Sequence, residues 1–366
     1  MTKNNKKTII LHDTFLYKGG GERLILMMGK TLWADIATGF FSKWSFDLRK
    51  EWFTGKMIEV SSEIFAKWFR HLKLKWAFLT KTKFLQNYDT VIFSGDSISA
   101  VRNCGNKQKK IYYCHTPPRY LYDLKHIYLA KIPFYMRPAF QVLSYFFKKM
   151  YERDIKKMDI ILTNSQNTKD RIKKFLDLDS QILYPPVNLE EFTFKGQWNY
   201  YLSFARLSDA KRVDKIIEAF KNLPEKKLVV IYGENDPQRE KIFDLAQWHK
   251  NIEFKTLPGN VWFTDYVGNC IATIYIPIDE DFGMSPVESM AAGKPVIWVN
   301  EGGLKETILD KKTGILISDE AKVSDLQQAI EDLNAQKSLE MRENCESRAQ
   351  DFSLDNFSEQ LQNLVK

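Results

Sequence analysis

Short apolar runs alternate with longer mixed segments along the first half of the chain. The runs are bounded by turn or polar residues and fall at residues 8–11, 88–94, 110–114, 159–163 and 181–184. Continuous apolar runs of this length are typical of strands that are buried on both faces of a parallel sheet. The long segment 137–157 is predicted to be helical, and another helix is predicted to begin at about Arg23.

The same pattern restarts in the second half. Pro185 and Pro186 mark a boundary, and the polar run to about Gln197 is typical of a linker. Further strands are predicted at residues 200–205, 227–232, 252–255, 271–276, 295–299 and 315–317. This alternation predicts two doubly wound α/β domains, over residues 1–186 and 187–349. Ligands of such sheets bind beyond the carboxyl ends of the strands, here in the cleft between the domains.

Length and composition are those of a folded protein with two domains. At 366 residues the chain is long for one core, and its 44% of apolar residues with nine Trp excludes a disordered chain. The four cysteines are widely spaced and form no C-x-x-C pair, which argues against a zinc site or a disulfide framework and favours a reducing compartment. The first residues lack the apolar region of a signal peptide, and no run of about 18 apolar residues could span a membrane.

Charge is divided unevenly between the two halves. Residues 1–186 hold 33 Lys and Arg against 16 Asp and Glu, whereas residues 187–366 hold 21 against 30. This asymmetry predicts that the first half meets an anionic surface. The basic, aromatic segments 65–84 and 125–157 could lie on an anionic bilayer. Nucleic acid is the rival partner, but no RNA- or DNA-binding motif is present. The plainer alternative is helices whose aromatic residues are core and whose lysines are solvated.

The segment 276–306 carries the most specific chemistry. Glu280 and Glu288 flank a short turn, 282–286, at which a helix is predicted to start. Their spacing puts Glu280 in the loop and Glu288 within the first turns of the helix. Backbone amides and the helix dipole make this N-terminus an anion site. The arrangement suits a sugar nucleotide, with hydroxyls for the glutamates and phosphates for the amides. The alternative is an ordinary βαβ turn with surface glutamates.

Three strand ends carry further candidates. Arg206 and Lys211 follow the first strand of the second half, where a guanidinium and an ammonium can hold a diphosphate. Gly20 and Gly21 follow the first strand of the chain and open a helix, where glycine lets backbone approach a ligand. The loop is not G-x-G-x-x-G, so nicotinamide binding is weakly supported. His115 ends another strand and could touch a sugar or shuttle a proton, although a lone histidine is more often structural.

Together these segments resemble glycosyltransferase family 4, the retaining enzymes with the GT-B fold. The similarity runs from residue 276 to Gly314 and includes the E-x7-E signature of Glu280 and Glu288. The segment around Arg206 is similar to the family's phosphate-binding motif, with Ala205 and Arg212 in place of its two glycines. The C-H-x-P segment around His115 resembles the branch that includes bacterial O-antigen and capsule mannosyltransferases.

The resemblance implies a role for each candidate residue. Glu288 would bind the ribose, Glu280 would contact the donor sugar near its anomeric carbon, and His115 would line the sugar site. The diphosphate would be held by basic side chains, a glycine and backbone amides, namely Arg206, Lys211, Gly20, Phe282, Gly283, Met284 and Ser285. Gly21, Arg119 and Tyr120 would lie on the acceptor side. No metal or other cofactor is expected, and the Asp-x-Asp of Asp177 and Asp179 is interpreted as incidental.

The resemblance further implies hexose transfer to a growing, lipid-linked surface glycan. The expected donor is GDP-mannose, with a UDP-sugar second, and the enzyme would be peripheral on the cytoplasmic face of the cell membrane. The final helix, at about 350–366, would cross back to the N-terminal domain. The alternatives are a sugar-nucleotide 2-epimerase or a phosphorylase of the same fold, or a non-catalytic sugar-nucleotide-binding subunit.

Overall fold

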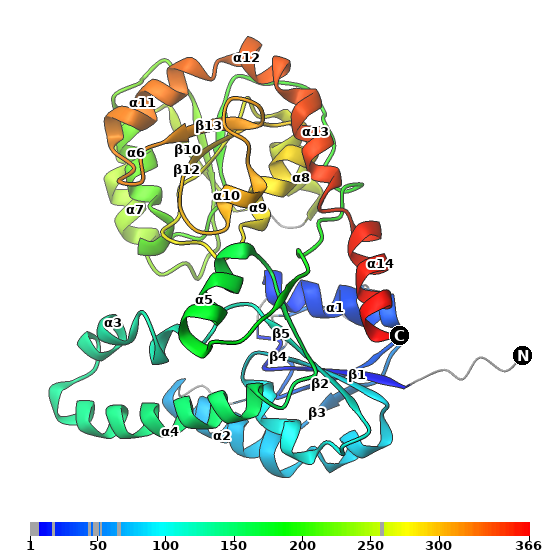
Figure 1. Cartoon of the computed structure of the whole chain (residues 1–366). Helices are drawn as coiled ribbons and strands as arrows, with labels where there is room; N and C mark the ends of the chain where they lie inside the picture. Colours follow the sequence, from blue (N-terminus) through cyan, green and yellow to red (C-terminus); the bar gives the residue numbers. More distant parts are fainter. Residues whose placement is uncertain are drawn as a thin grey trace, which may run out of the picture. The chain divides into compact units, whose positions relative to one another are not determined.

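Two parallel β-sheets organise the chain in the computed structural model, each within its own unit (Figure 1). Unit 1 comprises Met1–Tyr184 with Ser358–Lys366, and unit 2 comprises Pro185–Phe357. The structure describes residues 7–16, 19–42, 45–46, 51, 53–63, 67–256 and 260–366, without the side chains of 67–69 and 260–261. The first six residues and the beginning of the predicted segment 65–84 thus lie outside the described part of the chain.

Within the described residues, the sheet of unit 1 has seven strands in the order β3-β2-β1-β4-β5-β6-β7. In that order the strands are Met57–Glu59, Asp35–Thr38, Thr8–His12, Thr90–Ser94, Lys109–Cys114, Ile160–Thr163 and Gln181–Ile182. The five strands predicted in this half are confirmed. β2 and β3 were missed, because β2 has only four residues and opens on Asp35, and β3 is a three-residue edge strand that is only partly buried. Neither produces an apolar run that stands out in the sequence.

Helices pack on this sheet, and apolar side chains are buried between the helices and the strands. Ile9, Leu11, Val91 and Tyr112 are buried together with Phe78 of α2. The α-helices are α1 (Gly20–Leu32), α2 (Lys67–Thr80), α3 (Lys125–Ala130), α4 (Arg137–Ile155), α5 (Gln166–Leu176) and α14 (Leu354–Val365). The described residues of this unit also form the 3₁₀ segments η1 (Lys83–Asn87), η2 (Gly95–Asn103), η3 (Arg119–Leu121) and η4 (Phe134–Met136).

The C-terminal helix returns to unit 1, as predicted. The hydroxyl oxygens of Ser358 in α14 and Thr31 in α1 lie 3.0 Å apart, and Gln362 donates to the Thr31 carbonyl at 3.4 Å. α1 begins at Gly20, which is earlier than the start predicted at about Arg23. Among the helices of the described residues, none is long and apolar enough to cross a membrane.

In unit 2 the described part of the chain forms a sheet of six strands in the order β10-β9-β8-β11-β12-β13. In that order the strands are Ile252–Lys255, Leu228–Ile231, Tyr201–Ser203, Thr273–Tyr275, Val296–Val299 and Gly314–Ile317. All six were predicted. The surrounding helices are α6 (Val213–Lys221), α7 (Arg239–Leu245), α8 (Asn260–Asn269), α9 (Met284–Ala291), α10 (Leu304–Thr307), α11 (Val323–Asp332), α12 (Ala335–Glu340), α13 (Arg342–Gln350) and the 3₁₀ turn η5 (Asp209–Lys211).

Candidate active site

The strand order of unit 2 reverses between β8 and β11. β8 comes first in this unit, and its neighbours in the sheet are β9 on one side and β11 on the other. Loops that leave such a reversal diverge to opposite faces of the sheet, and ligands bind in the space that they open. The loop after β8 carries Arg206 and Lys211, and the loop after β11 carries Glu280. The topology therefore brings three of the predicted residues to one edge of the sheet.

Lys211 and Glu280 contact each other directly. The Lys211 ammonium lies 2.5 Å from a Glu280 carboxylate oxygen and donates to the Tyr275 hydroxyl at 2.7 Å. The two charged side chains are 21% and 25% exposed, so the pair is partly shielded from water. Tyr275 ends β11, and its burial, together with the nearby Glu280 carboxylate, raises its pKa well above the ordinary value. The phenol therefore stays protonated, and the ammonium is held at the carboxyl end of β11.

Glu288 lies in the second turn of α9, as predicted, and its side chain is 7% exposed. The helix begins after Gly283, whose φ of 86° is unfavourable for other residues. Phe282 is buried against Phe352, with ring centroids 5.5 Å apart, so its side chain is structural and only its backbone can meet a ligand. Met284 and Ser285, in the first turn, are half-buried. Their amides are among those that a helix start leaves without intrahelical partners.

The Glu280 loop is braced from the 301–303 segment. The Gly303 amide donates to the Glu280 carbonyl at 2.8 Å. Gly302 has a φ of 59°, and a Cβ atom there would overlap the Glu280 backbone. Glu301 accepts from the Asp279 amide at 2.9 Å and from the Arg212 guanidinium at 2.9 Å. Glu301 thereby ties the loop after β8 to the loop after β11.

Arg212 occupies a left-handed backbone position, with a φ of 51°. This conformation explains why the family motif that the sequence resembles has glycine here. In this chain the arginine side chain instead binds Glu301 and the Asp319 carbonyl.

Arg206 is less tightly held than Lys211. Its side chain is 63% exposed, and its Nε atom lies 3.6 Å from Asp236. The other oxygen of Asp236 accepts from the Leu207 and Gly233 amides at 3.0 and 3.1 Å. An exposed pair at this separation contributes little free energy, so Arg206 can turn toward an anionic ligand at small cost.

In unit 1, three polar side chains meet at the ends of adjacent strands. His12 ends β1, Ser94 ends β4, and His115 follows β5. The Ser94 hydroxyl lies 3.1 Å from Nδ1 of His12 and 3.0 Å from Nε2 of His115. Gly21 lies beside the same ring, because a Cβ atom there would be 3.8 Å from His115. Gly20 opens α1 and is exposed.

Both histidines are neutral at physiological pH. Burial lowers the pKa of His115 to about 4. Burial, and secondarily the charge that His115 would carry, lowers the pKa of His12 to about 3. A neutral imidazole has one donor and one acceptor nitrogen, so the Ser94 hydroxyl can donate to one ring and accept from the other. The chain of bonds fixes the orientation of the His115 ring.

Two carboxylates lie next to this histidine chain. Asp13 follows His12, and Asp96 lies two residues after Ser94. The Lys75 ammonium is 2.7 Å from Asp96, and both side chains are largely buried. Burial opposes ionisation of Asp96, but Lys75 lowers its pKa below the usual range. Burial and the Asp96 charge raise the pKa of Asp13 well above the usual range.

The two predicted acceptor-side residues lie on the segment after His115. Arg119 forms an ion pair with Asp123 at 2.8 Å, which holds η3 in place. Tyr120 packs against Tyr128 with ring centroids 6.2 Å apart, and burial raises its pKa. Their contact with an acceptor stays a prediction.

The Asp-x-Asp pair lies at the end of α5. Asp177 is the C-cap of this helix and pairs with Lys173 at 2.8 Å, and Asp179 lies 3.9 Å from the same ammonium. The aspartates are 89% and 99% exposed. Within the described part of the chain, no group of three or more His, Cys, Asp and Glu side chains is arranged to hold a metal ion.

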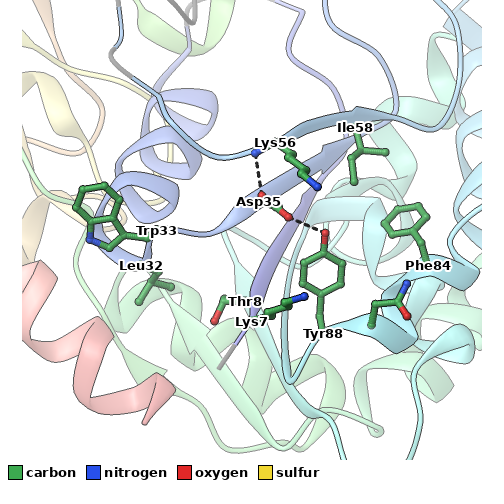
Figure 2. Close-up of a pocket in the computed structure, with 10 residues that line it drawn as sticks. Lys7, Thr8, Leu32, Trp33, Asp35, Lys56, Ile58, Phe84 and Tyr88 are labelled. Atoms are coloured by element: carbon green, nitrogen blue, oxygen red, sulfur yellow. Dashed lines mark hydrogen bonds between the residues drawn. The ribbon is translucent and has the colours of Figure 1, made fainter. Parts of the chain in front are cut away.

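A cavity of about 900 Å³ opens at the other edge of the unit 1 sheet (Figure 2). It lies where β1 and β2 begin, and Asp35 accepts there from the Lys56 amide at 2.8 Å and the Tyr88 hydroxyl at 2.7 Å. None of the candidate residues named from the sequence is among the described residues that line it. The strand ends with His12 and His115 are at the opposite edge.

Sequence reasoning missed several residues that complete these sites. Tyr275 and Asp236 in unit 2, and His12 and Ser94 in unit 1, were not singled out. Glu301 was noted only as part of the similarity to the family, with no role assigned. His12 and Ser94 share with His115 a position at the carboxyl end of an apolar run, which is a signal that could have found them. The pairing of Lys211 with Glu280 has no such local signal.

The chain is similar in sequence to known glycosyltransferases. Residues 187–352 match the family model for glycosyl transferases group 1. The alpha-1,3/1,6-mannosyltransferase ALG2 of Dictyostelium discoideum is 28% identical over 338 residues, which cover 77% of this chain and 76% of that protein. The O-antigen chain mannosyltransferase RfbU of Salmonella typhimurium is 28% identical over 176 residues, 45% of this chain and 48% of that protein.

The fold also matches a solved structure. HepE from Anabaena, in complex with UDP and glucose, has a TM-score of 0.73 at 16% identity, and the match covers 98% of this chain and 99% of that one. The predicted pair of Rossmann-like units of the GT-B fold is confirmed. The chain is a glycosyltransferase, and its residues 187–352 are similar to the glycosyl transferases group 1 family.

Proposed function

We propose that this glycosyltransferase moves a hexose from a sugar nucleotide to a growing, lipid-linked surface glycan and retains the anomeric configuration. Mannose from GDP-mannose is the proposed donor, because ALG2 and RfbU are both named mannosyltransferases. A UDP-sugar is the second candidate, since HepE was crystallised with UDP and glucose. A lipid-linked acceptor would require the enzyme to act at a membrane surface, and the cytoplasmic face is the proposed location.

The observation that carries the proposal is the ion pair of Lys211 and Glu280 at the strand-order reversal of unit 2. A nucleotide diphosphate gains negative charge as the glycosidic bond breaks. The Lys211 ammonium and the amides at the start of α9 would stabilise that charge. Glu280 would accept hydrogen bonds from hydroxyls of the donor sugar. Each member of the pair thus serves one part of the same donor.

Two further residues of unit 2 complete the proposed donor contacts. Glu288 would accept hydrogen bonds from the ribose hydroxyls, and its burial would make those bonds strong. Arg206 would exchange its weak contact with Asp236 for the diphosphate. These cations are the proposed reason that transfer needs no metal ion.

Retention of configuration is proposed to follow a front-face mechanism. The leaving phosphate would accept the proton of the acceptor hydroxyl while the new glycosidic bond forms on the same face of the sugar. His115, neutral and fixed by Ser94, would line the sugar site as a hydrogen-bonding group. No enzyme nucleophile is assigned.

A thermal-shift screen of GDP- and UDP-sugars tests the donor. A ligand at 100 times its dissociation constant adds about 2.7 kcal/mol of stability. We expect GDP-mannose to raise the melting temperature most, and transfer of labelled mannose to a lipid-linked acceptor to follow. Stabilisation by a sugar nucleotide without transfer or donor hydrolysis would favour a non-catalytic subunit. Isomerisation of the donor sugar would favour an epimerase.

A further inference from the structure

We infer that residues 125–149 of unit 1 form a docking element for an anionic lipid bilayer. This segment, hereafter the α3–α4 hairpin, comprises α3, η4 and the first part of α4. In Figure 1 it extends away from the sheet of unit 1. The inference rests on the proposed lipid-linked acceptor only for its purpose, since binding to a bilayer can be measured without any acceptor.

The α3–α4 hairpin exposes apolar side chains that a folded core would bury. Phe134 and Tyr135, in the turn between the helices, are 79% and 70% exposed. On α4, Val142, Tyr145 and Phe146 are each more than half exposed, at 56%, 59% and 57%. Contiguous exposed apolar surface of this kind marks an interaction site.

Most of the residues of α4 before residue 147 do not pack against the core of unit 1. Of its first ten residues only Ser144 is buried, whereas Tyr151, Asp154 and Ile155 near the end of the helix are buried. The helix is therefore anchored to unit 1 by its C-terminal half. The apolar residues of its N-terminal half are exposed on the surface of unit 1.

Charge identifies the partner of this surface. Residues 125–149 contain five Lys and Arg and no Asp or Glu. Such a segment attracts an anionic surface, because basic residues near anionic lipids add binding free energy and acidic residues are absent to oppose it. A second copy of the chain would bring two basic hairpins together, and their like charges would repel. Aromatic side chains among lysines also suit the headgroup level of a bilayer.

The structure favours the α3–α4 hairpin over α2 as the docking surface. α2 lies in segment 65–84, the first of the two basic, aromatic segments that the sequence indicated. In α2, Leu74, Ala77 and Phe78 are buried, and Lys75 is used internally in its ion pair with Asp96. A substitution of Lys75 would therefore test the fold of unit 1. The α3–α4 hairpin offers substitutions that leave the core intact.

The test is co-sedimentation of the full chain with vesicles of phosphatidylglycerol and phosphatidylcholine, and with vesicles of phosphatidylcholine alone. We expect binding to the anionic vesicles at low salt, loss of most of it at high salt, and little binding to the neutral vesicles. Lys125→Glu with Lys131→Glu should weaken binding about tenfold or more. The matched control, Lys250→Glu with Lys312→Glu on unit 2, makes the same change in net charge and should bind like the wild type.

A second variant tests the apolar side chains. Phe134→Ser, Tyr135→Ser and Phe146→Ser together should reduce vesicle binding severalfold or more. Trp198→Ser with Trp248→Ser is the control, because both tryptophans are exposed, at 64% and 95%, on unit 2. The triple variant should keep the melting temperature of the wild type and its transfer to a short soluble acceptor.

Three outcomes would overturn the inference. Unchanged vesicle binding in the triple variant would do so, as would equal binding of the wild type to neutral and anionic vesicles. The third outcome is measured by sedimentation velocity. If the wild type self-associates, and the triple variant loses self-association but keeps vesicle binding, then the partner of the hairpin is a second copy of the chain. Absence of sugar transfer by the wild type would refute the proposed function and leave the vesicle result standing.

Discussion

The Lys211 ammonium lies 2.5 Å from a carboxylate oxygen of Glu280, although the two residues are 69 positions apart. One follows β8 and the other follows β11, the two strands between which the sheet order of unit 2 reverses. The contact joins the residue assigned to the diphosphate with the residue assigned to the sugar. Each charge offsets part of the cost of burying the other.

Substituting Lys211 and Glu280 one at a time should test the diphosphate role and the sugar role separately. Lys211→Met should lower kcat for transfer by about 10²- to 10³-fold, the usual effect of losing one group that stabilises a developing negative charge. It should also weaken the binding of GDP alone. Glu280→Gln should leave GDP binding nearly unchanged and weaken the discrimination between GDP-mannose and GDP. Calorimetric titration of both ligands distinguishes the two, with Lys250→Met as the control. Equal GDP affinity in Lys211→Met and wild type would contradict the diphosphate role.

Glu288 is expected to report on the ribose. Glu288→Ala would leave ribose hydroxyls without partners and should weaken donor binding by about 1–3 kcal/mol. The side chain is buried, so the melting temperature of the variant must be measured alongside. The exposed Glu331 provides a control substitution. The 2′,3′-dideoxy donor should bind wild type more weakly than the normal donor by a similar amount, and the two donors should bind Glu288→Ala about equally. Unchanged affinity for the normal donor in the variant would refute it.

Transfer should survive a chelator. Lys211, Arg206 and the amides of α9 supply positive charge to the leaving group, which is the task that a divalent cation performs in other enzymes. We expect equal rates in EDTA and in magnesium or manganese, and no effect of Asp177→Asn. Loss of activity in EDTA that is restored by either metal would mean that a cation takes part.

Gly302 should be intolerant of a side chain. Its φ is 59°, and a Cβ atom would overlap the backbone of Glu280. Gly302→Ala should therefore destabilise unit 2 by more than about 1 kcal/mol and displace Glu280, with a large loss of transfer. Gly105→Ala is the matched control, because the nearest atom to its added Cβ would be 3.8 Å away. Urea unfolding and transfer rates measure both effects. Full activity in Gly302→Ala would show that the brace is not needed.

Acid should destabilise the fold through His115. Burial lowers its pKa from 6.5 to about 4, so the unfolded chain takes up a proton as the pH falls through 6.5, and the folded chain does not until about 4. The stability that His115 contributes is present above pH 6.5 and decreases as the pH falls toward 4.

His115→Gln isolates this contribution. The difference in unfolding free energy between wild type and variant should become smaller as the pH falls from 7 toward 4.5. Comparing the two proteins cancels the opposite trend from Asp13, whose raised pKa favours the folded state in acid. His126→Gln, at an exposed histidine, is the control. A difference that does not change with pH would contradict the neutral, buried state of the ring.

The local pattern of the chain was enough to predict eleven of its strands, the restart of the pattern after Pro186, and the helix start between Glu280 and Glu288. These features depend on apolar runs, turn residues and spacing, all of which act over a few neighbouring residues. His115 could be named for the same reason, because it ends an apolar run. β2 and β3 escaped notice because their stability comes from pairing in the sheet. β2 pairs with β1 and β3 pairs with β2, as Ile36 pairs with both Ile10 and Met57.

Only the tertiary structure decided which of the polar residues meet. Ser94 lies between His12 and His115 because β1, β4 and β5 are neighbours in the sheet, and Lys211 reaches Glu280 because β8 and β11 are neighbours. Strand order is set by the crossover connections and by packing of the whole unit, so no local spacing reports it. Lys75 is a second case in which local sequence is not enough. Its sequence neighbours suggest a solvated basic helix, yet its ammonium is largely buried in an ion pair with Asp96, which belongs to a different segment. Long-range packing determines whether a charge faces water, a partner or a substrate.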